Sequence, residues 1–131
     1  MEIKLLAQAF SVCKLPNASG IYLDRPFCFV ARTDEELSLV CETTFVPSDT
    51  VAREDGWRGF RIQGVLDFSM VGVLAQISSL LAHNNISIFA ISTYNTDYLF
   101  TKEENFHHAV ALLTGAGYAV DEAVASTSEL D

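Results

Sequence analysis

Residues 60–74, FRIQGVLDFSMVGVL, contain the pattern that decides the fold. Phe60, Ile62 and Leu66 alternate with other residues, which predicts a strand from Trp57 to Asp67 with one buried face. We expect a helix next, which ends at Asn84-Asn85. One face of it carries residues at helical spacing, the apolar Val71, Leu74, Ile77 and Leu81 together with Ser78. A strand that runs directly into a helix leaves free backbone N–H groups at the junction, and these groups can bind an anion such as a carboxylate.

The rest of the second half completes an α+β pattern. Residues 86–93, ISIFAIST, predict a strand that is apolar on both faces, and 98–100 are its expected hairpin partner. Thr101 and Glu104 have the spacing of a capping box for a second helix, which Gly115 and Gly117 end before a short strand at 118–120. The order strand, helix, strand, strand, helix, strand is the βαββαβ arrangement of ferredoxin-like folds.

The first half reads as a reduced copy of the second. It contains a predicted strand over residues 3–15 and a hairpin of 27–31 with 37–41, followed by a polar segment, 47–56, that we interpret as a linker. The hairpin resembles the one around residues 90–100, with a turn that differs by about one residue. This similarity indicates a weak internal duplication in which the helices of the first copy are shortened.

Composition excludes several classes of function. The chain has 131 residues, 50% hydrophobic and 19% charged, without an apolar run long enough for a membrane span or a recognisable signal peptide, so we expect a cytoplasmic protein with no membrane partner. Its formal net charge of −9, with 8 Lys and Arg against 17 acids, argues against nucleic acid. Cys13, Cys28 and Cys41 lie in apolar stretches and are expected to be free thiols.

The polar residues that are available for chemistry gather in two loops. We find no Ser/His/Asp or Cys/His pattern, and His107-His108 lack further ligands at metal spacing, so no metal or cofactor is expected. The candidate ligand-binding residues are Asp67, Ser69, Met70, Val71 and Gly72 in the first loop, and Ser92, Thr93, Asn95, Thr96 and Asp97 in the second. Three of these residues also have a structural interpretation. Asp67 and Ser69 suit a helix N-cap, and Asp97 suits an ordinary turn.

Residues 60–120 resemble an ACT domain, and in particular the bacterial double-ACT proteins related to the eukaryotic cytosolic arginine sensors. The segments that carry the resemblance are LDFSMVGVL at 66–74 and STYNTDY at 92–98, although the usual Pro-Gly of the first turn is Val71-Gly72 here. The resemblance implies two modules, a reduced ACT-like subdomain at 1–56 and an ACT domain at 57–131. It implies a non-catalytic sensor that binds an amino acid at an interface between ACT modules, within one chain or between two.

In that resemblance, backbone N–H groups from Met70 to Gly72 would bind the ligand carboxylate, and Asp97 or Asp67 would bind an ammonium or guanidinium group. The two-sided apolar strand at 86–93 needs cover on both faces of its sheet, which favours a homodimer. A regulated protein partner is also implied, without any indication of which one.

Two alternatives come from other classes. Residues 61–65, RIQGV, are similar to the strand that opens the phosphate cradle of acylphosphatases, which would make the chain a hydrolase on the same fold. That motif continues into Phe-Arg, whereas here Phe68 is followed by Ser69, so the main charge that would stabilise a transferring acyl phosphate is missing. The second alternative is a module that binds a partner protein and no small ligand.

Overall fold

The computed structural model describes residues 2–63 and 72–121, which form parts of two compact units. The C-terminal unit consists of residues 1–7 and 58–131, and the N-terminal unit consists of residues 8–57. Strand β5 (Ala52–Gln63) gives its first half to the N-terminal unit and its second half to the C-terminal unit. We describe the two units separately.

The C-terminal unit has a ferredoxin-like order of elements, which confirms the predicted fold class. After β5 come α1 (Val73–His83), β6 (Ile88–Ser92), β7 (Asp97–Lys102), α2 (Glu103–Gly115) and β8 (Ala119–Asp121). The strands lie in the order β6-β7-β5-β1-β8, where β1 (Glu2–Leu5) is an additional strand. It pairs antiparallel with β5 and parallel with β8, so it fills the place between them.

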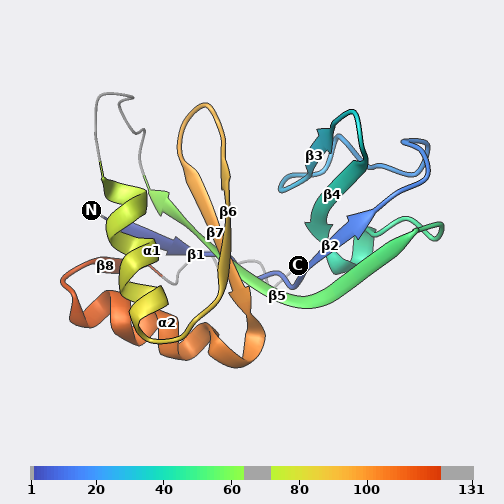
Figure 1. The fold of residues 1–131 in the computed structure, drawn as a ribbon. Coiled ribbons are helices and arrows are strands. Elements are labelled where there is room, and N and C mark those ends of the chain that lie inside the picture. Colours follow the sequence, from blue (N-terminus) through green and yellow to red (C-terminus); the bar gives the residue numbers. More distant parts are fainter. Residues whose placement is uncertain (1, 64–71, 122–131) are drawn as a thin grey trace. The chain divides into compact units, whose positions relative to one another are not determined.

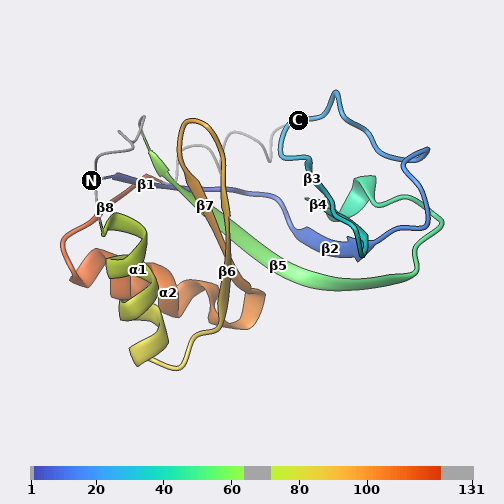
Figure 2. The same cartoon turned by 45° about the horizontal axis from the view of Figure 1, so that its top comes forward.

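One hydrophobic core holds this unit together. Both helices lie on the same face of the sheet (Figures 1 and 2), and Ile77, Leu81 and Leu113 of the helices pack with Phe60 and Ile62 of β5. All five side chains are fully buried. Because β5 is pleated, the alternate residues Arg61 and Gln63 must point to the opposite face of the sheet. The alternation of apolar residues in β5 therefore leaves the side chains of Arg61 and Gln63 outside the core, where they are available to a ligand.

The ends of the two helices differ in how well the sequence predicted them. Helix α1 ends as expected, with Asn85 in the left-handed conformation (φ 63°) and the Ile86 N–H bonded to the Leu81 carbonyl. The predicted capping box of α2 is wrong. Thr101 is a fully buried residue of β7 whose hydroxyl donates to the Lys102 carbonyl, and α2 begins at Glu103 without a side-chain cap.

The N-terminal unit is an antiparallel sheet built on the same strand order. Its elements are β2 (Phe10–Lys14), β3 (Phe29–Arg32), β4 (Leu37–Glu42), a short 3-10 helix (Thr43–Phe45) and the start of β5. The strands lie in the order β3-β4-β2-β5, which matches β6-β7-β5-β8 of the C-terminal unit once β1 is set aside. An irregular segment, 15–28, replaces the first helix, and the 3-10 helix lies in the sequence position of the second. This order agrees with a duplication whose first copy has shortened helices.

The hairpins of the two units have turns of the same length, which corrects the expected difference of one residue. Arg32 pairs with Leu37 in one unit and Ser92 pairs with Asp97 in the other, so each turn contains four residues. In each turn the first residue is a threonine whose N–H donates to the carbonyl of the fourth residue, over 2.9 Å at Thr33 and 2.8 Å at Thr93.

Two further predictions about the first half are wrong. Residues 3–15 form two strands rather than one, because residues 6–9 between β1 and β2 are not in a strand, and the two strands belong to different units. The polar segment 47–56 is only in part a loop, because β5 already begins at Ala52 and pairs with β2 through contacts such as Val12 with Glu54. Charged residues such as Arg53 and Asp55 are tolerated there because they are exposed and bond to each other.

Strand β6 is less buried than its apolar sequence predicted. Ala90 and Ser92 are exposed, whereas Ile88, Phe89 and Ile91 are half-buried. Within the part of the chain that the structure describes, β6 pairs only with β7, so it is an edge strand. An apolar edge strand of this kind offers unpaired backbone groups to another strand.

Candidate functional site

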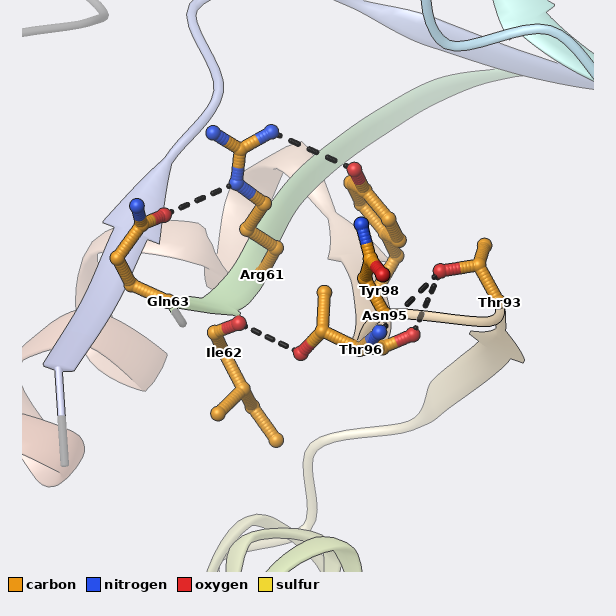
Figure 3. Close-up of a pocket in the computed structure, with 7 residues that line it drawn as sticks. All are labelled: Arg61, Ile62, Gln63, Thr93, Asn95, Thr96 and Tyr98. Carbon is orange, nitrogen blue, oxygen red and sulfur yellow. Dashed lines mark hydrogen bonds between the residues drawn. The ribbon is translucent and has the colours of Figure 1, made fainter. Parts of the chain in front are cut away.

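A polar cavity of about 310 Å³ lies in the C-terminal unit, where the β6–β7 turn meets the end of β5 (Figure 3). It is lined by residues of β5 and by residues in or next to the turn; the described lining residues are Arg61, Ile62, Gln63, Thr93, Asn95, Thr96 and Tyr98. The volume is at the small end of the range for ligand sites. It suits a molecule of about ten non-hydrogen atoms rather than a nucleotide.

Hydrogen bonds fix the turn that forms one side of this cavity. The Thr93 hydroxyl donates to the Thr96 carbonyl over 2.9 Å, and the Thr96 hydroxyl donates to the Ile62 carbonyl over 2.6 Å. Thr96 is only 8% exposed, so its bond ties the tip of the hairpin to β5 in a site with little competition from water. The turn is therefore held in one position relative to the strand that carries Arg61.

Arg61 is the cationic residue of the cavity, and two neutral side chains hold it. Its Nε–H donates to Gln63 Oε1 over 3.1 Å, and its Nη1–H donates to Tyr98 Oη over 3.4 Å. Figure 3 shows the two bonds leaving the guanidinium on opposite sides. Neither bond uses Nη2, so part of the planar donor fork remains available to an acceptor in the cavity.

The structure brings together three of the predicted ligand-binding residues, Thr93, Asn95 and Thr96. Ser92 and Asp97 do not line the cavity. They face each other at the base of the turn, where the Ser92 hydroxyl donates to the Asp97 carboxylate over 2.6 Å. This bond gives Asp97 a structural partner that the sequence did not reveal.

The first predicted loop is only partly described. Gly72 precedes α1 in a left-handed conformation (φ 88°), and its carbonyl accepts the Gln76 N–H over 2.8 Å. This φ is one that residues with a side chain rarely adopt, which explains the glycine at this point. Asp67, Ser69, Met70 and Val71 lie outside the described residues.

Sequence reasoning missed three lining residues, Arg61, Gln63 and Tyr98. A signal for two of them was present, because Arg61 and Gln63 occupy the positions that alternate with the buried Phe60 and Ile62. A strand whose outward positions carry a cation and an amide next to a predicted ligand loop is a candidate wall of the same site. Tyr98 could be predicted as a lining residue only if the pairing of β7 with β5 were known.

The N-terminal unit also contains a polar cavity, of about 360 Å³, but none of its described lining residues is basic. Burial raises the pKa of the Cys13, Cys28 and Cys41 thiols, that of Cys41 to about 12, so these thiols are protonated and poor nucleophiles near neutral pH. All three are free cysteines. No group of three His, Cys, Asp or Glu residues suited to a metal occurs in 2–63 and 72–121. None of the helices in these ranges has the length and apolar character to cross a membrane.

These features define an α+β protein of the ferredoxin-like class with a small polar site at one end of its sheet. The ACT domain family matches residues 52–115, from the start of β5 to the end of α2. The chain belongs to the ACT domain family. ACT domains are regulatory modules that bind small ligands, and this general role extends to the present chain.

Several solved structures have a similar fold. Protein Atu0741 from Agobacterium tumefaciens is 30% identical, with 92% of each chain covered and a TM-score of 0.82. A protein of unknown function from Vibrio cholerae, VC0802, described as a possible transport protein, is 23% identical over 86% of each chain, with a TM-score of 0.67.

The same fold occurs in the ligand-free regulatory subunit of aspartate kinase from Thermus thermophilus. That protein is 10% identical, and the match covers 89% of this chain and 97% of that one, with a TM-score of 0.64. A search of curated proteins finds no match.

Proposed function

We propose that the chain is a non-catalytic regulatory protein that binds a free amino acid, with the ligand held at an interface between ACT modules. The observation that supports this proposal is the cavity between the β6–β7 turn and the end of β5. It combines a positioned cation, Arg61, with amide and hydroxyl groups from Gln63, Asn95 and Thr93. Such a set of groups can hold the polar end of an amino acid and fix its orientation.

The interface part of the proposal rests on the family and on the open form of the site. The described lining residues come from one hairpin and one strand only, so a second module could supply the remaining side. The partly exposed apolar edge strand β6 supports a homodimer, because strand pairing at an edge is a common route to association. The free thiols suit the reducing cytoplasm, where we place the protein.

A thermal-shift screen of the purified chain against the twenty amino acids tests this function. A ligand present at about 100 times its dissociation constant stabilises the folded state by roughly 2.7 kcal/mol, which raises the melting temperature measurably. We expect at least one amino acid to do so. The test concentration is about 10 mM, which is on the order of 100 times a dissociation constant of 0.1 mM. If none of the twenty amino acids changes the melting temperature at that concentration, the proposal is wrong.

Acetyl phosphate belongs in the same screen because it separates the sensor from the acylphosphatase-like hydrolase. Release of inorganic phosphate by the purified chain would favour the hydrolase. A chain that neither responds to an amino acid nor hydrolyses acetyl phosphate would instead fit a protein-interaction module without a small ligand.

A further inference from the structure

We propose that Arg61 binds a carboxylate of the ligand, and that the cavity selects amino acids with acidic or neutral side chains over basic ones. This inference rests on the proposed function, because it assigns a ligand class to the same cavity. It differs from the expectation from the sequence, in which backbone N–H groups from Met70 to Gly72 bound the carboxylate and Asp97 or Asp67 bound an ammonium or guanidinium group.

The geometry of the Arg61 guanidinium suits a carboxylate. Gln63 and Tyr98 bond to Nε and Nη1 from opposite sides, which restrains rotation of the side chain and fixes the plane of the fork. The Nη2 group and the second hydrogen of Nη1 lie on the end of the fork that these bonds leave unused. A carboxylate can accept two parallel hydrogen bonds from that end, in the bidentate arrangement typical of arginine.

The charge of the cavity also favours an anion. None of the described residues that line the cavity is acidic. Arg61 forms no ion pair within the described part of the chain, whereas Arg53 pairs with Asp55 at 3.0 Å. In a protein with 17 acids and 8 basic residues, an arginine that neutral groups hold is available to an external anion.

Lys4 strengthens this field. It is the cross-strand neighbour of Arg61 in the β1–β5 pair, and its alternation with the buried Ile3 and Leu5 places it on the same face of the sheet as Arg61. Its own charge is partly balanced by Asp121, 3.9 Å away. A cationic ligand group would therefore meet repulsion from Arg61 without a described lining carboxylate to offset it.

The remaining lining groups fit the other end of such a ligand. The side-chain amides of Gln63 and Asn95 offer both donors and acceptors, so they can bond to a carboxylate, an amide or a hydroxyl. The Thr93 hydroxyl already donates to the Thr96 carbonyl. A volume of about 310 Å³ has room for a side chain the size of glutamate or glutamine. A ligand with an acidic or neutral side chain needs no carboxylate of the protein at this end of the cavity. A site for lysine or arginine would need one.

Calorimetric titration of the full chain with matched probes tests the inference. The amino-acid probes are glutamate, glutamine, lysine and arginine, and the simpler pair is glutarate against cadaverine, which share a five-carbon chain and carry opposite charge. We expect heat of binding from glutamate, glutamine or glutarate. Lysine, arginine and cadaverine should bind at least tenfold more weakly.

Variants of Arg61 connect the selectivity to this residue. Arg61→Gln should weaken binding of the preferred carboxylate probe by about 10- to 100-fold, the range expected for loss of a charge-assisted hydrogen-bond pair. Arg61→Lys should give an intermediate loss, because it keeps the charge and removes the planar fork. Arg32→Gln is the matched control: it removes an exposed arginine from β3 of the N-terminal unit, outside the cavity lining, and we expect less than a threefold change. Circular dichroism must show that all three variants remain folded.

Each outcome has a distinct meaning. Preference for lysine, arginine or cadaverine would overturn the proposed selectivity, and unchanged affinity in folded Arg61→Gln would overturn the carboxylate assignment. Neither result would by itself contradict the amino-acid sensor. Glutarate binding without any amino-acid binding would support the Arg61 site and contradict the proposed function. Absence of binding by every probe and by all twenty amino acids would overturn both.

Discussion

Thr96 connects the β6–β7 turn to β5 through one buried hydroxyl group. Thr96→Val keeps the shape of the side chain but leaves the Ile62 carbonyl without this donor, which the structure places 2.6 Å away. We expect a loss of about 1–2 kcal/mol in the free energy of unfolding, measured by urea denaturation. The ligand affinity should fall as well, because the turn that lines the cavity is no longer fixed to the strand.

Thr114→Val is the control for this substitution. Thr114 is exposed, and its hydroxyl donates to the Val110 carbonyl of its own helix over 2.9 Å. Its replacement should change the unfolding free energy by less than about 0.5 kcal/mol. Equal stability losses in the two variants would show that the Thr96 bond is not a special anchor of the turn.

Cys41 predicts a pH effect on stability. Burial, with smaller contributions from nearby thiols and Glu42, raises its pKa from 9.0 to about 12 in the folded protein. The unfolded thiol ionises near pH 9 while the folded one keeps its proton. Stability from this group is therefore complete below pH 9 and declines between pH 9 and 12, by up to about 1.4 kcal/mol per pH unit.

The measurement is urea denaturation of the wild type and of Cys41→Ala at several pH values. The range runs from about pH 8 to about pH 10.5, so that it spans the unfolded pKa of about 9. The difference between the two proteins should shrink as the pH rises, because only the wild type loses this contribution. A pH-independent difference would mean that the thiol is not shielded as the structure indicates.

At the scale of single residues, the sequence predicted the polar turn but not its partners. Thr93, Asn95 and Thr96 were expected from their position between two apolar strands, and the structure places them at the cavity. The bond between Asp97 and Ser92 could not be predicted, because it depends on the register of the hairpin. Arg61 was not predicted as a lining residue because a charge on an outward strand position is usually only solvated.

Among the secondary-structure elements, the contact of β5 with β7 depends on a glycine. A Cβ atom at Gly59 would come within 2.7 Å of the Phe100 ring and 3.4 Å of Leu6. Both neighbours are fully buried, so they have little room to move. We expect Gly59→Ala to lower the unfolding free energy by about 1–3 kcal/mol, measured by urea denaturation.

Gly115→Ala serves as its control. A Cβ there meets no atom within 4 Å, and Gly115 is the last residue of α2. This substitution should be neutral or stabilising by up to about 1 kcal/mol, because alanine restricts the unfolded chain and favours the helix. A Gly59→Ala protein as stable as the Gly115→Ala protein would contradict the close packing of β5 and β7.

Elements defined by local periodicity were predicted well. Helices α1 and α2 and both hairpins follow from the spacing of apolar residues, and they occur where expected. The failures concern elements that depend on distant partners. Strand β1 pairs with β5 and β8, which lie more than 50 residues away in sequence, and no local pattern marks such a pairing. The polar start of β5 reads as a linker because its exposed charges hide the strand.

The capping box at Thr101 shows how a motif can match by chance. The spacing of Thr101 and Glu104 is that of a true box, yet burial of Thr101 in β7 moves the start of α2 to Glu103. The sequence pattern could not reveal that the strand continues through the threonine. Tertiary packing decided the boundary.

At the scale of the whole molecule, we predict a homodimer. The reason is the partly exposed apolar edge of β6, which leaves backbone groups for a partner strand. Size-exclusion chromatography with light scattering should give a mass of about 29 kDa, twice the 14.4 kDa of one chain. The protein concentration should be about 50 μM, on the order of the dissociation constant of a weak dimer. A mass of 14.4 kDa at this concentration would contradict the dimer, and any ligand would then bind to a single chain.

The most direct test of the central claim is a two-dimensional ¹H–¹⁵N NMR titration of the chain with the amino acid that gives the largest thermal shift. We expect saturable changes that are largest for the amides of Arg61, Gln63 and the 93–98 segment, which border the cavity. We expect only small changes for the core of the N-terminal unit at 8–57. Absence of any saturable change, or changes confined to residues 8–57, would contradict the claim that this cavity binds an amino acid.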